Sequence, residues 1–238
     1  MLIAAFIFQF RKPSAIAPVR CFVVLSICAW QVVDMSKHST CFVIGADGWC
    51  PQAQHQPSPN FDARLADVPT ELLVIHNISL PPGQFGGPFI GALFCNELDH
   101  DAHPYFDQLR GLRVSAHFLI RRDGQVLQFV SANARAWHAG ISSFNGRQRC
   151  NDFSIGIELE GSDFVPFDDV QYIVLTQLTL ALQRRYQLTN VVGHEHIAVG
   201  RKTDPGPFFD WARYQQNLQA LGEAAQLHVA SGLAGSQA

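Results

Sequence analysis

The segment 191–207, with the sequence VVGHEHIAVGRKTDPGP, gathers the residue types of a metal site into one short loop. His194 and Asp204 are of the types that bind zinc, Lys202 lies between them, and two prolines restrict the backbone directly after the carboxylate. A catalytic zinc site needs three protein ligands and one open position, so the third ligand must come from elsewhere. The alternative is that His194 and His196 are surface histidines and that Lys202 and Asp204 form a solvated pair.

Two predicted strands carry further polar side chains. The run LLVIH, residues 72–76, is typical of a strand buried on both faces, and its last residue, His76, lies where sites are usually built. The run SIGIELEG, residues 154–161, alternates strictly, so its aliphatic residues share one face while Glu158 and Glu160 share the other with serine and glycine. Two carboxylates beside such small residues indicate the wall of a site. The alternative is an exposed sheet edge.

The first elements that would position these side chains follow from the periodicity of the chain. Residues 41–50 predict a short strand and a turn. Residues 88–98 have helical spacing of apolar side chains, with a proline in the first turn. Residues 113–130 predict a hairpin, because two alternating runs are joined through Asp123 and Gly124, a dipeptide that suits a type I′ turn.

The second half of the chain adds a loop and two helices. Residues 131–152 are expected to form a long polar loop, and loops of that length are often functional. Residues 168–188 predict the strongest helix, with a capping-box start and an apolar stripe. A last helix is expected from Asp210, followed by a flexible tail over residues 223–238. Strands that alternate with helices predict an α/β fold with a central mixed sheet flanked by helices.

Length and composition narrow the class of protein. The 238 residues suit one domain with ends to spare. A net charge of −3 with 16% charged residues offers no basic surface for nucleic acid. The six cysteines form no C-x-x-C pair, which excludes a zinc ribbon or a redox motif and favours reduced thiols over disulfides.

The apolar segment 1–34 has four interpretations. As a membrane anchor it carries Arg20 near the centre of its second apolar run, and as a signal peptide it lacks a basic start. It is otherwise an unstructured extension, or Met35 is the true start of the protein. A membrane association is expected only if residues 1–34 are translated and retained.

Several long motifs together resemble one family. In order, they are LLVIHNISLPPGQFGG, RVSAHFLIRRDGQVLQFV, ARAWHAGIS, RCNDFSIGIELEG and GH followed by RKTDPGP. They resemble the AmpD family of N-acetylmuramoyl-L-alanine amidases, from about Trp49 to Trp211. The resemblance implies a zinc amidase domain over residues 35–222, with the fold shared by phage amidases and peptidoglycan recognition proteins.

The resemblance also implies a site. Carried over by motif, the Zn²⁺ ligands are His76, His194 and Asp204. Glu158 is the implied general base, and Lys202 the implied stabiliser of the oxyanion. The pair Glu195 and His196 after the second ligand departs from the commoner motif, which leaves the ligand assignment intact.

Four more positions resemble substrate contacts of the family: Asn77, Arg113, Trp137 and Arg149. The arginines suit the carboxylates of a stem peptide.

The implied reaction is hydrolysis of the amide between (1,6-anhydro-)N-acetylmuramic acid and L-alanine, on cytoplasmic muropeptides recovered from cell-wall turnover. One alternative is an exported or membrane-anchored periplasmic amidase that acts on intact peptidoglycan, favoured by the segment 1–34. Another is a non-catalytic muropeptide-binding protein, disfavoured because no implied ligand is missing.

Overall fold

The computed structural model of the protein describes residues 41–221 and 227–231. The chain divides into two units, Met1–Val33 and Asp34–Ala238, and every described residue belongs to the second. The expectations for the segment 1–34 and for a start at Met35 therefore lie outside the described residues. Among the residues that are described, no helix is both long enough and apolar enough to cross a membrane.

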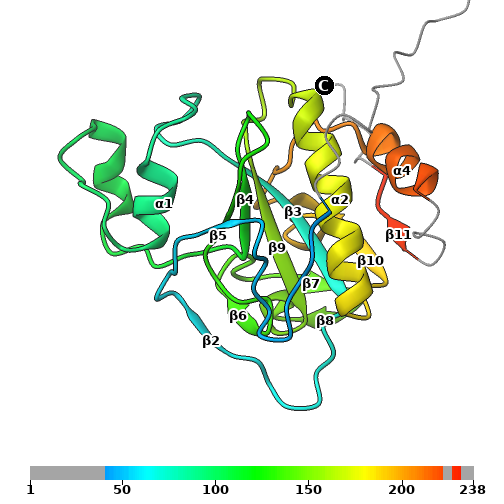
Figure 1. Ribbon diagram of the computed structural model, residues 1–238. Coiled ribbons are helices and arrows are strands. Elements are labelled where there is room, and N and C mark those ends of the chain that lie inside the picture. The colour runs from blue at the N-terminus through cyan, green and yellow to red at the C-terminus, as the bar shows by residue number, and fades with distance from the viewer. Residues whose placement is uncertain (1–40, 222–226, 232–238) are drawn as a thin grey trace, which may run out of the picture. The chain divides into compact units, whose positions relative to one another are not determined.

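A mixed seven-stranded sheet forms the centre of the second unit (Figure 1). Its strands, in chain order, are β1 (Gln54–His55), β3 (Leu72–Ile78), β4 (Phe118–Ile120), β5 (Val126–Gln128), β9 (Ser154–Glu160), β10 (Asn190–Gly193) and β11 (His228–Val229). In space the order is β1-β5-β4-β9-β3-β10-β11, and all neighbours are parallel except the hairpin β4-β5. The predicted mixed sheet is confirmed.

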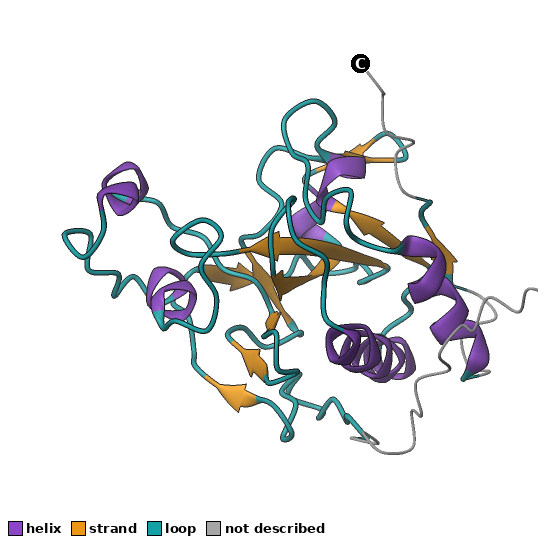
Figure 2. Cartoon of the chain, turned by 90° about the horizontal axis from the view of Figure 1, so that it is seen from above, coloured by secondary structure: helices purple, strands orange, loops and turns teal. Residues whose placement is uncertain are grey.

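Helices and two small sheets surround this centre. The helices are α1 (Phe89–Phe94), α2 (Asp169–Arg185), α3 (His194–Ile197) and α4 (Trp211–Ala220), with 3₁₀ turns η2 (Pro104–Leu109) and η3 (Cys150–Asp152). The small sheets pair β2 (Phe61–Ala63) with β6 (Ala134–Ala136), and β7 (Ser143–Phe144) with β8 (Arg147–Gln148). Seen from above, the longest helix lies on one side of the central sheet, and loops with a short helix lie on the other (Figure 2).

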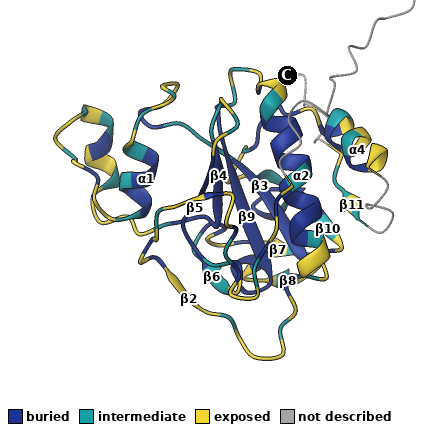
Figure 3. Ribbon diagram, in the orientation of Figure 1, coloured by how far each residue is buried: buried dark blue, intermediate teal, exposed yellow. Residues whose placement is uncertain are grey.

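The longest helix, α2, forms where the sequence predicts it. Asp168 and Gln171 make the expected capping box, which satisfies backbone groups at the helix start. Most of its buried apolar residues join the largest apolar cluster together with α4 and one face of β3 and β9. Figure 3 shows the inner side of α2 and the central strands as one buried region.

The central strand β9 has two unlike faces. Ile155, Ile157 and Leu159 belong to the α2 cluster, so by alternation Ser154 and Glu158 point to the opposite side of the sheet. All seven residues of β9 are buried. The prediction of a polar wall is therefore confirmed, and the alternative of an exposed edge is wrong.

The hairpin at residues 113–130 is confirmed, but its turn differs from the prediction. A type I′ turn needs two residues with positive φ, whereas only Gly124, at φ +86°, has one. The N–H of Gly124 donates to the carbonyl of Arg121, and the N–H of Arg121 donates to that of Gln125. This is the three-residue connection with a left-handed glycine, which places one more residue in the turn.

Three local predictions were wrong. Residues 131–152 form more than a loop, because they contain β6, β7, β8 and η3. Residues 41–44 form no strand, although Phe42 and Ile44 are buried in the main core. The described part of the tail contains β11, which pairs with β10 and packs Val229 against that core, so this part buries apolar surface that the sequence did not predict.

Candidate active site

The three predicted metal ligands meet where neighbouring parallel strands end. His76 is near the end of β3, and His194 directly follows β10, whose last residue, Gly193, is in register with Ile75. Asp204 comes from the loop after α3, whose backbone is tied back because the N–H of Glu195 donates to the Asp204 carbonyl. The carboxyl end of the sheet thus gathers side chains that are far apart in the sequence.

These three side chains form a triangle. The Nδ1 atoms of His76 and His194 are 3.1 Å apart, and Asp204 Oδ2 lies 2.9 and 3.0 Å from them. Ligand bonds of 2.0–2.1 Å in a tetrahedral site give edges of about 3.3 Å, close to this triangle. In the part of the chain that the structure describes, this is the only group of three such residues with the spacing of a metal site.

The outer nitrogen of each imidazole also has a partner. His76 Nε2 lies 3.0 Å from His138 Nδ1, and His194 Nε2 lies 3.0 Å from the carbonyl oxygen of Ala139. Metal-binding histidines almost always donate their second N–H in this way, which fixes the ring and its tautomer. Both rings are buried, and burial lowers the pKa of His76 to about 4, so the neutral ring that a metal requires is favoured.

The third predicted ligand is held as a carboxylate. Burial alone would raise the pKa of Asp204, but the imidazoles of His194 and His76, at 3.0 and 2.9 Å from its Oδ2, lower it below its usual value. Two neutral imidazoles and one carboxylate are a donor set that zinc accepts. The residues therefore fit the metal that the sequence implies.

Glu158 lies beside the triangle. It is the register partner of His76 on the adjacent strand, and its Oε2 is buried without a hydrogen-bond partner among the described residues. Burial and then the charge of Asp204 raise the pKa of Glu158 well above its usual value, while the charge of Lys202 lowers it. A buried carboxyl group with one unengaged oxygen and an elevated pKa suits a group that accepts and returns a proton.

Glu160, which shares this face of β9, is fully engaged. Its Oε1 accepts from the N–H of Gly86 at 2.7 Å and pairs with Arg121 at 3.5 Å, and its Oε2 accepts from the N–H of Arg122 at 3.2 Å. These contacts make Glu160 a structural anchor for two loops and leave Glu158 as the carboxylate available for chemistry.

Lys202 is exposed on the ligand loop, the segment 198–210 that carries Asp204. Its backbone N–H donates to the carbonyl of Ala198, which fixes the start of the loop. The ammonium charge acts on both His76 and Glu158, since it lowers the pKa of each. Lys202 thus belongs to the electrostatic environment of the triangle.

Asn77 holds the ligand loop. Its Nδ2 donates to Asp163 Oδ1 at 2.7 Å and to the carbonyl of Pro205 at 3.0 Å. Asp163 Oδ2 in turn accepts from the hydroxyl of Thr203 at 2.5 Å. Because Thr203 and Pro205 flank Asp204, both neighbours of this ligand are fastened to the same pair of side chains.

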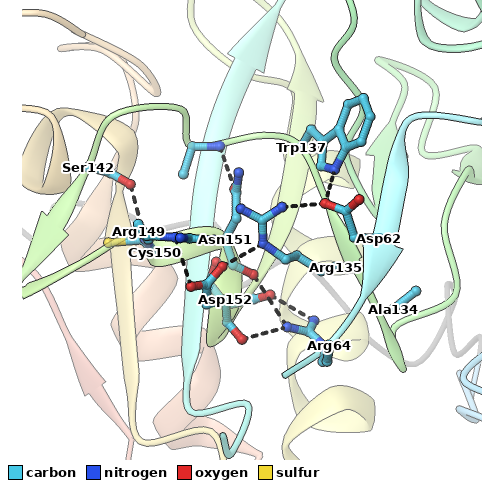
Figure 4. A network of polar contacts seen from close by, with 12 residues as sticks. Asp62, Arg64, Ala134, Arg135, Trp137, Ser142, Arg149, Cys150, Asn151 and Asp152 are labelled. Atoms are coloured by element: carbon cyan, nitrogen blue, oxygen red, sulfur yellow. Dashed lines mark hydrogen bonds and ion pairs between the residues drawn. The ribbon is translucent and has the colours of Figure 1, made fainter. Parts of the chain in front are cut away.

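Trp137 and Arg149 are joined through a polar network, drawn in Figure 4. Trp137 Nε1 and Arg135 Nη1 donate to one oxygen of Asp62, at 2.7 and 2.6 Å. Arg135 Nε donates to Asp152 Oδ1 at 2.5 Å, and Asp152 Oδ2 pairs with Arg149 Nε at 3.1 Å. A continuous series of hydrogen bonds and ion pairs therefore links these two predicted substrate contacts.

The structure separates Arg113 from Arg149. Arg149 lines a surface groove of about 570 Å³ together with Gly140, Ile197 and Ala198, which adjoin the histidine-bearing segments. Arg113 lines a different hollow of about 160 Å³. Arg149 therefore has the better position for a ligand that reaches the triangle.

The extra imidazole at His196 turns away from the triangle. Its Nδ1 accepts from the N–H of Gly193, and its Nε2 lies 3.0 Å from the Ser231 carbonyl. The neighbouring Glu195 has its pKa raised to about 7, first by burial and then by the charges of Asp204 and Asp163. Neither residue belongs to the metal-ligand triangle.

Sequence reasoning missed the residues behind the ligands, above all His138, Asn151 and Asp163. His138 lies in the segment 131–152, which was predicted as a long polar loop of the kind that is often functional, but no role was assigned to it. The available signal was the small residues on the site face of β9, since Gly156 leaves the space that the His138 ring occupies.

Comparison with known proteins places this site in context. The profile described as N-acetylmuramoyl-L-alanine amidase matches residues 66–207. A Citrobacter freundii protein named 1,6-anhydro-N-acetylmuramyl-L-alanine amidase AmpD is 57% identical over 171 residues, which cover 71% of this chain and 91% of the relative. The protein of that name from Escherichia coli K12 is 56% identical over 170 residues, covering 71% and 93%. A crystal structure of a selenomethionine AmpD derivative has a TM-score of 0.71 at 56% identity, covering 72% of this chain and 97% of the other.

Proposed function

This chain belongs to the N-acetylmuramoyl-L-alanine amidase family, and from that premise we propose that it is a zinc-dependent amidase of 1,6-anhydro-muropeptides. The observation that carries the proposal is the triangle of His76, His194 and Asp204 beside the carboxyl group of Glu158, whose buried Oε2 has no hydrogen-bond partner among the described residues. Zinc held in such a site acts as a Lewis acid on the amide carbonyl and makes water nucleophilic near neutral pH.

Glu158 moves the protons in the proposed reaction. Its Oε2 accepts a proton from the attacking water and returns one to the nitrogen of the leaving amine. The water oxygen forms a bond to the carbonyl carbon and the carbon–nitrogen bond breaks, which leaves a lactyl carboxylic acid and a peptide whose free amine belongs to L-alanine, and the acid then loses its proton to that amine. Atoms and charge balance without a further reactant.

Lys202 and the carboxylate-binding groups complete the proposed site. The Lys202 ammonium stabilises the negative charge that develops on the carbonyl oxygen. Arg149 presents a guanidinium on the groove that Gly140, Ile197 and Ala198 also line, where it suits a stem-peptide carboxylate. Trp137 contributes a contact surface held in place by Asp62. Arg113, which lines a different hollow, and Asn77, which holds the loop of Asp204, stay as predicted contacts.

The substrate class rests on the relatives. The proteins from C. freundii and E. coli are named for the 1,6-anhydro-N-acetylmuramyl-L-alanine bond, and this chain covers more than nine tenths of each. We therefore propose that the natural substrates are anhydro-muropeptides from cell-wall recycling and that the enzyme works in the cytoplasm. A non-catalytic binding protein is disfavoured, because His76, His194, Asp204, Glu158 and Lys202 are all present.

One experiment separates this proposal from the exported alternative. Purified anhydro-muropeptide and intact sacculi are digested side by side, and the released L-alanyl peptide is measured at equal substrate concentration. We expect rapid cleavage of the soluble muropeptide and slow or absent cleavage of sacculi. Faster cleavage of intact sacculi would favour an amidase of the cell envelope, and cleavage of neither would contradict the proposed activity.

A further inference from the structure

We infer that His138 is a positioning residue for the proposed zinc centre, because it determines which nitrogen of His76 carries the proton. The inference rests on the proposed function, since it concerns the tautomer in which His76 can bind a metal. His138 contacts His76, a proposed zinc ligand, but is not itself one of the three residues of the triangle.

The contacts form a buried chain of three side chains. His76 Nε2 lies 3.0 Å from His138 Nδ1, and His138 Nε2 lies 3.1 Å from the Ser154 hydroxyl. The two imidazole rings meet edge to face, with centroids 5.1 Å apart and planes at 85°. All three residues are at most 9% exposed. A shared proton at each link is thus shielded from exchange with bulk water.

The chain admits two proton arrangements with opposite consequences. When His76 donates from Nε2, His138 accepts at Nδ1 and donates from Nε2 to the Ser154 oxygen, so His76 Nδ1 is free to bind the metal. When Ser154 donates to His138, His138 donates to His76, and the proton of a neutral His76 then sits on Nδ1, where it blocks the metal. The identity and tautomer of residue 138 therefore decide whether His76 is ready to act as a ligand.

The surrounding structure holds the His138 ring in this place. A Cβ atom on Gly156 would lie 2.5 Å from His138 Cγ, so only glycine leaves room for the ring against β9. The side-chain oxygen of Asn151 accepts from the backbone N–H groups of both His138 and Ala139, at 3.2 and 2.8 Å. The Ala139 carbonyl is itself the partner of His194 Nε2. One dipeptide, fixed by Asn151, therefore supports both imidazole ligands.

A second buried histidine provides a matched control. His117 is fully buried and its ring centroid lies 5.7 Å from that of His138. Its ring accepts from the N–H of Gly156, and its Nε2 lies 3.1 Å from the Ala134 carbonyl and 3.3 Å from Arg64. It has no hydrogen bond to a metal ligand. Loss of His117 removes a buried imidazole without changing the partner of His76.

The test measures zinc affinity by competition with a chromogenic chelator in His138→Leu, His138→Asn and His117→Leu, on folded protein selected by size-exclusion chromatography and near-ultraviolet circular dichroism. Loss of an outer partner typically weakens metal binding 10–100-fold, which we expect for His138→Leu. His138→Asn keeps an acceptor near the Nδ1 position and should recover most of the affinity. His117→Leu should bind zinc as the wild type does, although its stability falls.

Two outcomes would overturn the inference. One is wild-type zinc affinity in folded His138→Leu, and the other is a His138→Asn variant that binds no better than His138→Leu, which would reduce the role to packing. Should the leucine variant not fold, nitrogen-15 NMR of the zinc-loaded wild type decides: protonated Nε2 on both His76 and His138 is expected, and a protonated Nδ1 on His138 contradicts us. Failure of the proposed function is distinguishable, because the wild type would then bind no zinc or would bind it without hydrolysing the muropeptide, whereas the role of His138 is read from differences in zinc affinity among the variants.

Discussion

The two faces of β9 differ in what holds them together. On the α2 side, aliphatic residues such as Ile157 pack into one apolar cluster, where stability comes from burial and close packing. On the opposite side, polar groups pair one by one, from Ser154 with His138 to Glu160 with the Arg121 loop, and only Glu158 keeps an oxygen unpaired. Because side chains alternate along β9, one face carries residues that stabilise the fold and the other carries residues proposed to take part in the reaction. Substitutions on the two faces should therefore have different consequences.

The largest effect is expected at the three proposed zinc ligands on the polar side. His76→Ala, His194→Ala and Asp204→Ala should each empty the zinc site and abolish amidase activity, because two remaining donors do not make a catalytic site. Elemental analysis of the purified variants measures this. Full zinc occupancy in any one of these variants would show that the substituted residue is not a zinc ligand. It would also weaken the functional distinction between the two faces of β9.

The next effect concerns Glu158. Glu158→Ala should keep zinc and substrate binding but lower kcat by roughly 10²–10⁴-fold, since a general acid–base group typically contributes that much. Steady-state kinetics, with zinc measured in the same samples, test this against the matched variant Glu160→Ala. Near-normal kcat in Glu158→Ala together with a collapse in Glu160→Ala would show that the base is the other carboxylate.

The neighbouring residue on the apolar face provides the converse test. Ile157 is fully buried, and Ile157→Ala should lower the free energy of unfolding by about 2–5 kcal/mol, the usual range for such truncations. The kcat of the folded fraction should change little. Denaturant unfolding and kinetics on the same preparation measure both. A loss of kcat as large as that of Glu158→Ala would mean that the two faces are not separate.

A smaller effect is expected at Asn77, whose hydrogen bonds hold the ligand loop. Asn77→Ala removes the contacts to Asp163 and Pro205 that hold Asp204 in place, so zinc affinity should fall by about tenfold, at the low end for outer partners of a metal ligand. Chelator competition measures this affinity. A raised KM with unchanged zinc affinity would instead support the prediction that Asn77 contacts the substrate.

No effect on catalysis is expected from the start of the chain. A protein that begins at Met35 should be soluble, folded and as active as the full chain, because every residue of the proposed site lies between His76 and Asp204. Solubility and specific activity of the two forms provide the comparison. Aggregation of the shorter form, or activity confined to a membrane-bound full chain, would favour the anchored alternative.

The sequence predicts those parts of the molecule that depend on local pattern. The alternation of β9 and the capping box of α2 are written in adjacent residues, so both faces of the strand and the start of the helix could be expected. The ligand positions followed from motifs shared with a family.

The rest depends on contacts across the chain. The His138 ring meets His76 over 62 positions, and Asn77 meets Pro205 over 128, distances at which local periodicity carries no information. The hairpin turn was mistaken for a related reason, since Asp-Gly fits both a type I′ turn and the three-residue connection that the strands adopt. Long-range polar partners and turn register therefore had to come from the structure.

The central claim is that the polar side of the sheet carries the site of a zinc-dependent amidase. Removing the metal and adding it back tests this claim most directly. The purified enzyme is assayed on a 1,6-anhydro-N-acetylmuramyl peptide as isolated, after chelation, and after addition of one equivalent of zinc, with released L-alanyl peptide and bound metal measured together. We predict one zinc per chain, loss of hydrolysis on chelation, and recovery with zinc. Undiminished hydrolysis by the metal-free protein, or none by the zinc-loaded protein, would contradict the account.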